Sequence, residues 1–184
     1  SSAIGTMPMM CWNDSSNGPG APHVHAFVNV AMDGDAPLSV GEPLGENPAP
    51  LVGAGVQRLF ERALRTQCGA DLAHYDEDAV AGRLRKGPIR AGDIYTLESW
   101  QDHAVVVEVR GAELAPARVA ALRAEGRALE PDRRYAIATP AEVARESPHE
   151  LGRIESTRRD VLVREATIAY LRTHGFAELH AERG

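Results

Sequence analysis

The sequence lacks any excess of basic residues, and this shortage limits the partners that the protein can have. Its 20 lysines and arginines face 26 aspartates and glutamates, which gives a formal net charge of −6. Proteins held on nucleic acid by phosphate neutralisation carry the opposite balance. We therefore expect a protein that does not bind nucleic acid.

Cysteines and long hydrophobic runs are scarce too. The two cysteines, Cys11 and Cys68, lie far apart and form neither a CxxC pair nor a disulfide pattern. No run approaches the 18 or more apolar residues that span a bilayer, and the N-terminus lacks the order of a signal peptide. Residues 1–6 resemble a cloning remnant ahead of a native start at Met7. These features predict a cytoplasmic location without membrane contact.

The length of 184 residues favours one domain that folds without a metal or a disulfide. Residues 1–22 are rich in Met, Asn, Ser, Gly and Pro, and they predict an irregular N-terminal arm. Residues 23–184 form the expected domain.

Hydrophobic periodicity predicts both strands and helices along this domain. Strands are expected at residues 23–32, 70–75, 103–110 and 134–139, with Gly111 ending the third. Helices are expected at residues 52–67, 112–125 and 160–174, with Pro116 in a first turn and Asp160 as an N-cap, together with a short helix at residues 140–146 and a short helix or turn at residues 90–97. Irregular structure is expected at residues 37–50, 76–86 and 147–158. Strands and helices do not alternate strictly, which predicts an α+β fold with a layered mixed sheet.

Three short segments in the middle of the chain form a recognisable series. They are Gly69-Ala70-Asp71-Leu72-Ala73, the Gly-Pro-Ile-Arg-Ala-Gly-Asp stretch from Gly87 to Asp93, and Val105 to Leu114. In their order and spacing they resemble the C-terminal domain of 5′-nucleotidases. The resemblance extends over about residues 40–176. It implies a domain that binds the base and sugar of a nucleotide, whereas the metals and the hydrolytic chemistry belong to a separate metallophosphatase domain of that family.

The resemblance fails at the loop that follows the strand at residues 70–75. Where the family has Asn-Gly-Gly-Gly-Ile-Arg, this chain has Asp76, Glu77 and Asp78 followed by Ala-Val-Ala. Three acids would repel a phosphate and favour a cationic or amine-bearing ligand. Their mutual repulsion would also raise a carboxyl pKa toward the range of a general base, with His103 as a further candidate for acid/base chemistry. The alternative is a solvated charged loop.

Trp100 falls where the family has a stacking phenylalanine. An indole at this position would stack on a planar ligand, with Asp102 and Arg83 as further ligand-binding candidates. The alternative is a tryptophan that packs in the core or at an interface. Asp102 and His103 are adjacent on the expected strand, where neighbouring side chains point to opposite faces.

A separate metal site is the third possibility. His23 and His25 lie on one face of the expected first strand, about 7 Å apart, and Cys11 would add a soft ligand suited to copper or zinc. A His-x-His pair on a strand can equally be structural or solvent-facing. No cofactor follows with certainty; a divalent metal or copper is the candidate.

These observations together predict a stand-alone domain that binds a small planar or nucleoside-like ligand and has no intrinsic phosphatase activity. One alternative is a small biosynthetic enzyme of specialised metabolism that reuses the nucleotide pocket. Another is a hydrolase that needs a partner metallophosphatase chain. The expected partner is a small molecule, and a homodimer or a complex with another protein is compatible with the sequence.

Overall fold

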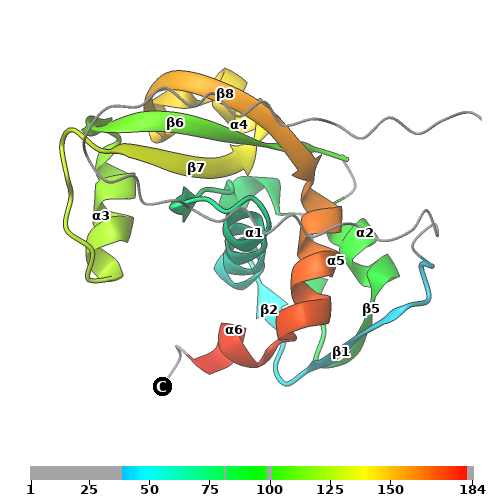
Figure 1. The fold of residues 1–184 in the computed structure, drawn as a ribbon. Helices are drawn as coiled ribbons and strands as arrows, with labels where there is room; N and C mark the ends of the chain where they lie inside the picture. Colours follow the sequence, from blue (N-terminus) through cyan, green and yellow to red (C-terminus); the bar gives the residue numbers. More distant parts are fainter. Residues whose placement is uncertain (1–38, 81, 99–100, 182–184) are drawn as a thin grey trace, which may run out of the picture. The chain divides into compact units, whose positions relative to one another are not determined.

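A four-stranded mixed sheet forms the centre of the computed structural model, which describes residues 39–80, 82–98 and 101–181. The strand order is β3-β7-β6-β8, and Figure 1 labels β7, β6 and β8. Strand β3 (Leu72–Ala73) runs parallel to β7 (Arg134–Pro140), and β6 (His103–Leu114) runs antiparallel to both β7 and β8 (Gly152–Leu162). This arrangement confirms the predicted α+β class with a mixed sheet.

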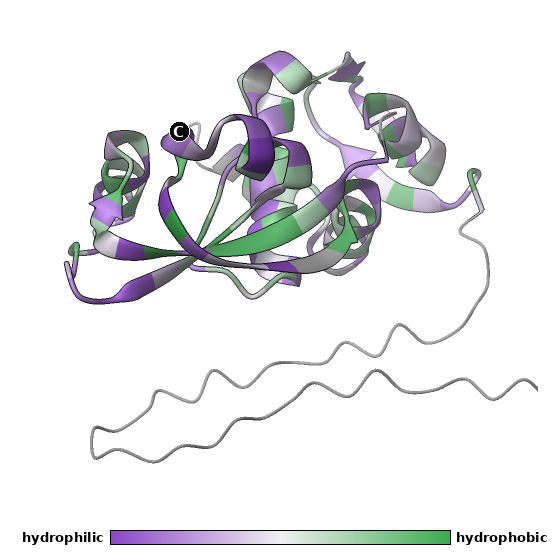
Figure 2. Cartoon of the chain, turned by 90° about the horizontal axis from the view of Figure 1, so that it is seen from above, coloured by the Kyte–Doolittle hydropathy of each residue, from purple (hydrophilic) through white to green (hydrophobic). Residues whose placement is uncertain are grey.

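Helices cover both faces of this sheet because the side chains of β6 alternate between two apolar clusters. Val105 and Val107 pack toward α3 (Pro116–Ala124) and α4 (Ala141–Glu146). Ala104 and Val106 pack on the other side, toward α1 (Ala54–Gln67) and α5 (Val163–His174). Figure 2 shows the hydrophobic stretch along the centre of the sheet. Within the described ranges, no helix is long and apolar enough to cross a membrane.

Two small antiparallel ribbons extend the layer of α1 and α5. Strand β1 (Pro43–Asn47) pairs with β5 (Gly87–Arg90), and β2 (Leu51–Val52) pairs with β4 (Arg83–Leu84). The remaining elements are α2 (Ala91–Leu97), α6 (Ala177–Ala181) and the 3₁₀ turns η1 (Glu77–Ala79) and η2 (Pro148–Glu150).

Most expected elements between residues 52 and 146 are confirmed within about two residues: they are α1, β3, α2, β7 and α4. The prediction of irregular structure at residues 37–50 is wrong, because β1 lies inside it. Pro43 is the first residue of that strand, where its missing N–H is tolerated. Gly45 has a φ of 123° at a shift in register, a conformation that favours glycine. The strand predicted at residues 23–32 and the arm at 1–22 lie outside the described residues.

The prediction that Gly111 ends a strand is also wrong. Strand β6 continues to Leu114, so residues 112–115 are not helical, and α3 begins at Pro116. Gly111 donates its N–H to the carbonyl of Arg133 at 2.8 Å. A Cβ at this position would overlap the carbonyl oxygen of Glu130. Glycine here permits a close backbone approach rather than a break.

The loop predicted at residues 147–158 is largely strand β8, and Asp160 belongs to this strand instead of capping α5. The residue that precedes α5 is Leu162. Strand β8 contains few apolar residues and pairs along β6, so tertiary pairing rather than a hydrophobic pattern determines it.

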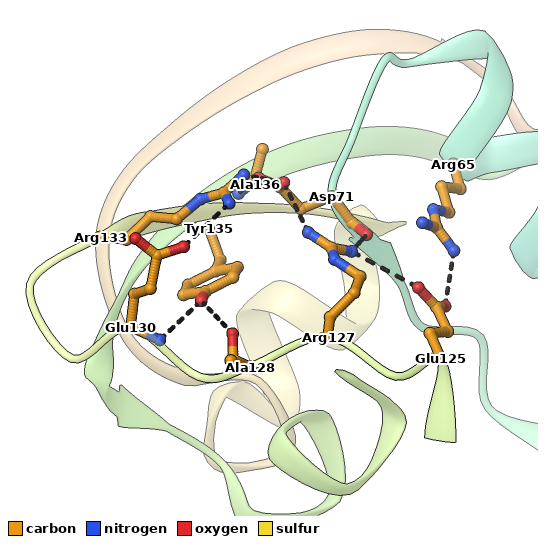
Figure 3. A network of polar contacts seen from close by, with 9 residues as sticks. All are labelled: Arg65, Asp71, Glu125, Arg127, Ala128, Glu130, Arg133, Tyr135 and Ala136. Atoms are coloured by element: carbon orange, nitrogen blue, oxygen red, sulfur yellow. Dashed lines mark hydrogen bonds and ion pairs between the residues drawn. The ribbon is translucent and has the colours of Figure 1, made fainter. Parts of the chain in front are cut away.

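A polar network fixes the start of β3 against β7 (Figure 3). Oδ1 of Asp71 accepts hydrogen bonds from Nη2 of Arg127 at 3.0 Å and from Nη2 of Arg133 at 2.6 Å. Its Oδ2 accepts the backbone N–H of Ala136 in β7 at 3.0 Å. The side chain of Asp71 is 17% exposed. One carboxylate therefore joins three segments that are distant in sequence.

Candidate functional site

Polar side chains gather where the carboxyl ends of β3 and β7 meet the beginning of β6. Ala73 pairs with Ala138 in the parallel ladder, and Val105 pairs with Thr139 in the antiparallel one. The loop after β3, the segment that enters β6 and helix α4 after β7 therefore meet at one edge of the sheet. We call this group the edge site; its members are Tyr75, Asp76, Glu98, Asp102, His103, Thr139, Glu142 and Arg145.

Glu98 is the most deeply buried carboxylate of the edge site. It follows α2 directly and is 1% exposed. Its Oε1 accepts the backbone N–H of Asp102 at 3.1 Å, whereas Oε2 is buried and has no hydrogen-bond partner among the described residues. Burial raises the pKa of the Glu98 carboxyl. The backbone N–H groups of Asp102 and Gln101 and the positive charge of Arg164 oppose this rise only in part.

Tyr75 lies close enough to the carboxylates of the edge site for their negative charge to act on its hydroxyl. Its ring packs on Phe60 with centroids 4.7 Å apart, and the residue is 3% exposed. Burial raises the pKa of the Tyr75 hydroxyl, and nearby carboxylates raise it further. In decreasing order of effect, these carboxylates are Glu98, Asp102, Asp76 and Glu142. Four acids from four segments therefore act on one phenol.

Asp102 and Arg145 complete the charge balance of the edge site. Burial raises the pKa of the Asp102 carboxyl, and the charge of Arg145 opposes this rise. Arg145 itself bonds Oε1 of Glu146 through Nη2 at 2.9 Å, and its side chain is 70% exposed. Arg145 therefore offsets the effect of burial on the Asp102 carboxyl only in part.

Two further buried polar atoms at this edge lack a partner among the described residues. They are Nδ1 of His103, at the start of β6, and Oγ1 of Thr139, near the end of β7. Thr139 is fully buried. Buried polar atoms are nearly always hydrogen-bonded in folded proteins, so such atoms at one site require an explanation.

A second polar cluster lies beside the edge site, on the side of α3. Nε2 of His74 lies 2.6 Å from Oε2 of Glu150, and its Nδ1 lies 3.8 Å from Oε1 of Glu61. His74 is 6% exposed. Burial lowers the pKa of the neighbouring Arg118, whereas the negative charges of Glu61 and Glu150 raise it. Through the contact between His74 and Glu150, turn η2 is held against the end of β3.

The structure brings together only some of the predicted site residues. Asp76, Asp102 and His103 belong to the edge site. Asp78 is exposed, and its N–H donates to Oδ1 of Asp76 at 2.9 Å, which closes the turn η1. Glu77 lies in the same turn, but its side chain is outside the described part.

Arg83 stands apart from these residues. It is exposed in β4 and pairs with Val52. Among the described residues, no hydrogen bond or ion pair joins Arg83 to the edge site.

The other predicted residues cannot be placed. Trp100, Cys11, His23 and His25 lie outside the described residues, so the stacking platform and the His-x-His metal site stay predictions. Residues 39–80, 82–98 and 101–181 contain no group of three or more His, Cys, Asp and Glu side chains that could hold a metal ion.

Sequence reasoning missed Tyr75, Glu98, Thr139, Glu142 and Arg145 as site residues. Glu98 follows a short helix whose pattern predicts a solvated acid, and nothing in the sequence indicates its burial. Its position two residues before Trp100 was the one available signal. Thr139 and Glu142 join the site only because β7 pairs with both β3 and β6.

Replacement of Glu98 by glutamine is expected to stabilise the protein at neutral pH. Between the ordinary pKa of 4.5 and the higher value in the folded state, the unfolded chain releases a proton that the folded chain retains. The stability contributed by Glu98 is therefore present at low pH and lost as the pH rises through this window. We expect Glu98→Gln to raise the free energy of unfolding at pH 7 by about 1 kcal/mol and to reduce its decline with rising pH.

Urea unfolding between pH 4 and 7.5 measures this effect. Glu113→Gln, at an exposed position near the other end of β6, makes the same charge change and serves as the control. A Glu98→Gln variant that is less stable than the wild type at pH 7 would show that the charged carboxylate stabilises the fold.

Comparisons with known proteins agree with this architecture. Residues 45–117 match the family model described as 5′-nucleotidase, C-terminal domain. A comparison with curated protein sequences finds no match.

Solved structures resemble the fold at low sequence identity. A 5′-nucleotidase precursor from Thermus thermophilus superimposes with a TM-score of 0.55 at 15% identity, covering 72% of this chain and 36% of the other. The NAD nucleotidase of Haemophilus influenzae superimposes with a TM-score of 0.56 at 15% identity, and the match covers 74% of this chain and 36% of the other. A sulfate thiohydrolase from Thermus thermophilus has a TM-score of 0.52 at 15% identity, and the match covers 74% of this chain and 33% of the other. The chain thus spans about a third of the length of these proteins.

Proposed function

We propose that this chain, as a 5′-nucleotidase C-terminal-like domain, binds a small planar or nucleoside-like ligand at the edge site. The observation that carries the proposal is Oε2 of Glu98, which is buried and has no partner among the described residues. Nδ1 of His103 and Oγ1 of Thr139 at the same edge of the sheet also lack partners among these residues, and Thr139, which pairs with Val105, faces the side of α3 and α4. A ligand that donates a hydrogen bond to Oε2 of Glu98 would satisfy an atom that otherwise costs free energy in the folded state.

The position of the edge site supports binding as well. In open sheets with parallel strands, ligands commonly bind outside the carboxyl ends of the strands. Strands β3 and β7 are parallel, and their carboxyl ends both face this group of residues. The proposed stacking residue Trp100 lies in sequence between Glu98 and Asp102, which are both members of the site.

We propose further that the 184-residue chain by itself does not hydrolyse nucleotides. The edge site contains the carboxylates of Asp76, Glu98, Asp102 and Glu142, all of which act on Tyr75. Four carboxylates at one edge repel a phosphate group rather than hold it. The structural matches span about a third of the nucleotidases, so their activity is no guide to the activity of this chain.

Thermal unfolding in the presence of adenosine, uridine and AMP tests the binding proposal. A ligand at 100 times its Kd adds about 2.7 kcal/mol of stability, which is easily measured. We expect stabilisation by at least one nucleoside, weaker stabilisation by AMP, and no release of phosphate from AMP with added divalent metals. Rapid phosphate release by the purified chain would contradict the second proposal.

Trp100→Ala tests the stacking residue, with Trp12→Ala as a control of the same residue type. We expect Trp100→Ala to weaken the binding of the nucleoside by roughly 1 to 3 kcal/mol without unfolding the protein. If Trp100→Ala unfolds the chain and leaves the affinity of the remaining folded protein unchanged, the indole is structural.

One observation favours a second candidate, acid/base catalysis on the bound ligand. Burial raises the pKa of the carboxyls of Glu98 and Asp102, and perturbed carboxyls of this kind gather at catalytic sites. A catalytic role would give a turnover whose pH profile changes in Glu98→Gln, whereas a binding role changes affinity alone.

A further inference from the structure

We infer that the ligand of the edge site is an organic cation with N–H donors, such as an amidinium or an aromatic ammonium, and that Glu98 is its anchor. This inference rests on the proposed function and narrows it to a class of ligand. The positive group of the ligand would contact the buried carboxylate of Glu98, and no phosphate group would bind at this edge.

The geometry of Glu98 carries the first step. One carboxylate oxygen is fixed by the backbone N–H of Asp102 at 3.1 Å, which orients the group. The other oxygen is buried and accepts nothing from the described residues. A carboxylate that is 1% exposed and half satisfied has lost most of its hydration without replacing it. A donor from a ligand would restore the missing hydrogen bond.

The second step is the charge of the edge site. Asp102 and Arg164 act on the Glu98 carboxyl with opposite signs, and Asp102, Asp76 and Glu142 act together with Glu98 on Tyr75. The guanidinium of Arg164 also lies over the ring of Tyr95, 4.8 Å from its centroid, and Arg145 is bonded to Glu146. Four carboxylates therefore face two arginines, and this excess of negative charge favours a bound cation.

The third step separates an organic cation from a metal ion. Calcium takes six to eight oxygen ligands, mostly from the protein, and magnesium takes six, several of which are water molecules that need open space around the carboxylate. Glu98 offers one free oxygen, and the described residues contain no group of three metal-ligating side chains. A charged N–H donor needs only one or two acceptors, and charge-assisted hydrogen bonds of this kind are about twice as strong as neutral ones.

Three planar probes of the same size and different charge test the inference: benzamidine (+1), benzamide (0) and benzoate (−1), titrated by NMR into the full chain. We expect benzamidine to bind about tenfold more tightly than benzamide, and benzoate to bind least. In Glu98→Gln, the advantage of benzamidine over benzamide should disappear. Glu113→Gln should keep it, because that acid lies near the other end of β6. Adenosine and uridine are titrated in parallel.

The outcomes distinguish this inference from the proposed function. If benzamide, benzoate or a nucleoside binds at the edge site as tightly as benzamidine, the binding domain stands and the preference for a cation is overturned. A benzamidine affinity that is unchanged in Glu98→Gln removes Glu98 as the anchor. Competition of benzamidine with micromolar Mg²⁺ or Ca²⁺ would make the site a metal site. If no probe or nucleoside binds, the proposed function fails as well.

Discussion

Gly111→Ala is expected to destabilise the protein by about 3 kcal/mol, because an added methyl group has no space at this position. Its Cβ would overlap the carbonyl oxygen of Glu130 and would lie 3.0 Å from the carbonyl carbon and 3.1 Å from Cε2 of Tyr135. Neither neighbour moves freely. The hydroxyl of Tyr135 accepts the N–H of Glu130 at 3.0 Å, and Gly111 itself bonds Arg133. Strand β6 must therefore bend away or lose these bonds.

Gly41→Ala is the matched control for this substitution. Its Cβ would meet only Oγ of Ser39 at 3.7 Å and Nη1 of Arg90 at 3.9 Å, which are ordinary contacts. We expect a change within about 0.5 kcal/mol, since the added methyl group also reduces the entropy of the unfolded chain. Urea unfolding measures both variants. Equal midpoints for the two would mean that the backbone at Glu130 is not packed on Gly111.

Asp71→Ala is expected to destabilise the protein by about 2 kcal/mol. The substitution leaves the guanidinium groups of Arg127 and Arg133 without their shared acceptor and leaves the N–H of Ala136 unpaired. The cost stays below the roughly 3 to 5 kcal/mol typical of a broken buried ion pair, because the two arginines are 28% and 36% exposed and regain water. Asp71→Asn keeps one acceptor and should cost about half as much.

A double-mutant cycle between Asp71→Ala and Arg133→Ala isolates their interaction. We expect a coupling of about 1 kcal/mol from the unfolding free energies. Glu130→Ala serves as the exposed control: it removes a contact of 3.4 Å to Arg133 from a side chain that is 65% exposed, and it should cost less than about 0.5 kcal/mol. A coupling near zero would assign the loss in Asp71→Ala to the bonds with Arg127 and Ala136.

Elements with strong local signals were predictable from the sequence. Helix α1 carries apolar residues three and four positions apart, and the Ala-Val-Val-Val run at residues 104–107 has the composition of a central strand. Strand β8 lacks such a signal because its residues are mostly charged or polar, and its pairing with β6 is visible only in the folded chain. Gly111 shows a related difficulty: glycine marks both breaks and close approaches, and the partner backbone at Glu130 decides between them.

The candidate site was predictable only in its location. The resemblance to the nucleotidase domain directs attention to the loop after β3 and to the segment before β6, and Asp76, Asp102 and His103 do lie there. Burial was not predictable, since it depends on the packing of α2, α5 and the sheet around Glu98. The position of Arg83 was not predictable either. It was expected to bind the ligand, but it lies in β4, which pairs with β2 in a separate ribbon.

The two layers around the sheet differ in how firmly they are held. Helix α1 buries six residues, including Leu59 and Phe60, whereas α4 has no buried residue and meets the sheet mainly through Ala141 and Ala144. Segments with few buried apolar contacts open at a lower free energy than the global unfolding of a protein. Glu142 and Arg145 are thus carried by an element that can be displaced while α1 and its large apolar side chains stay in place.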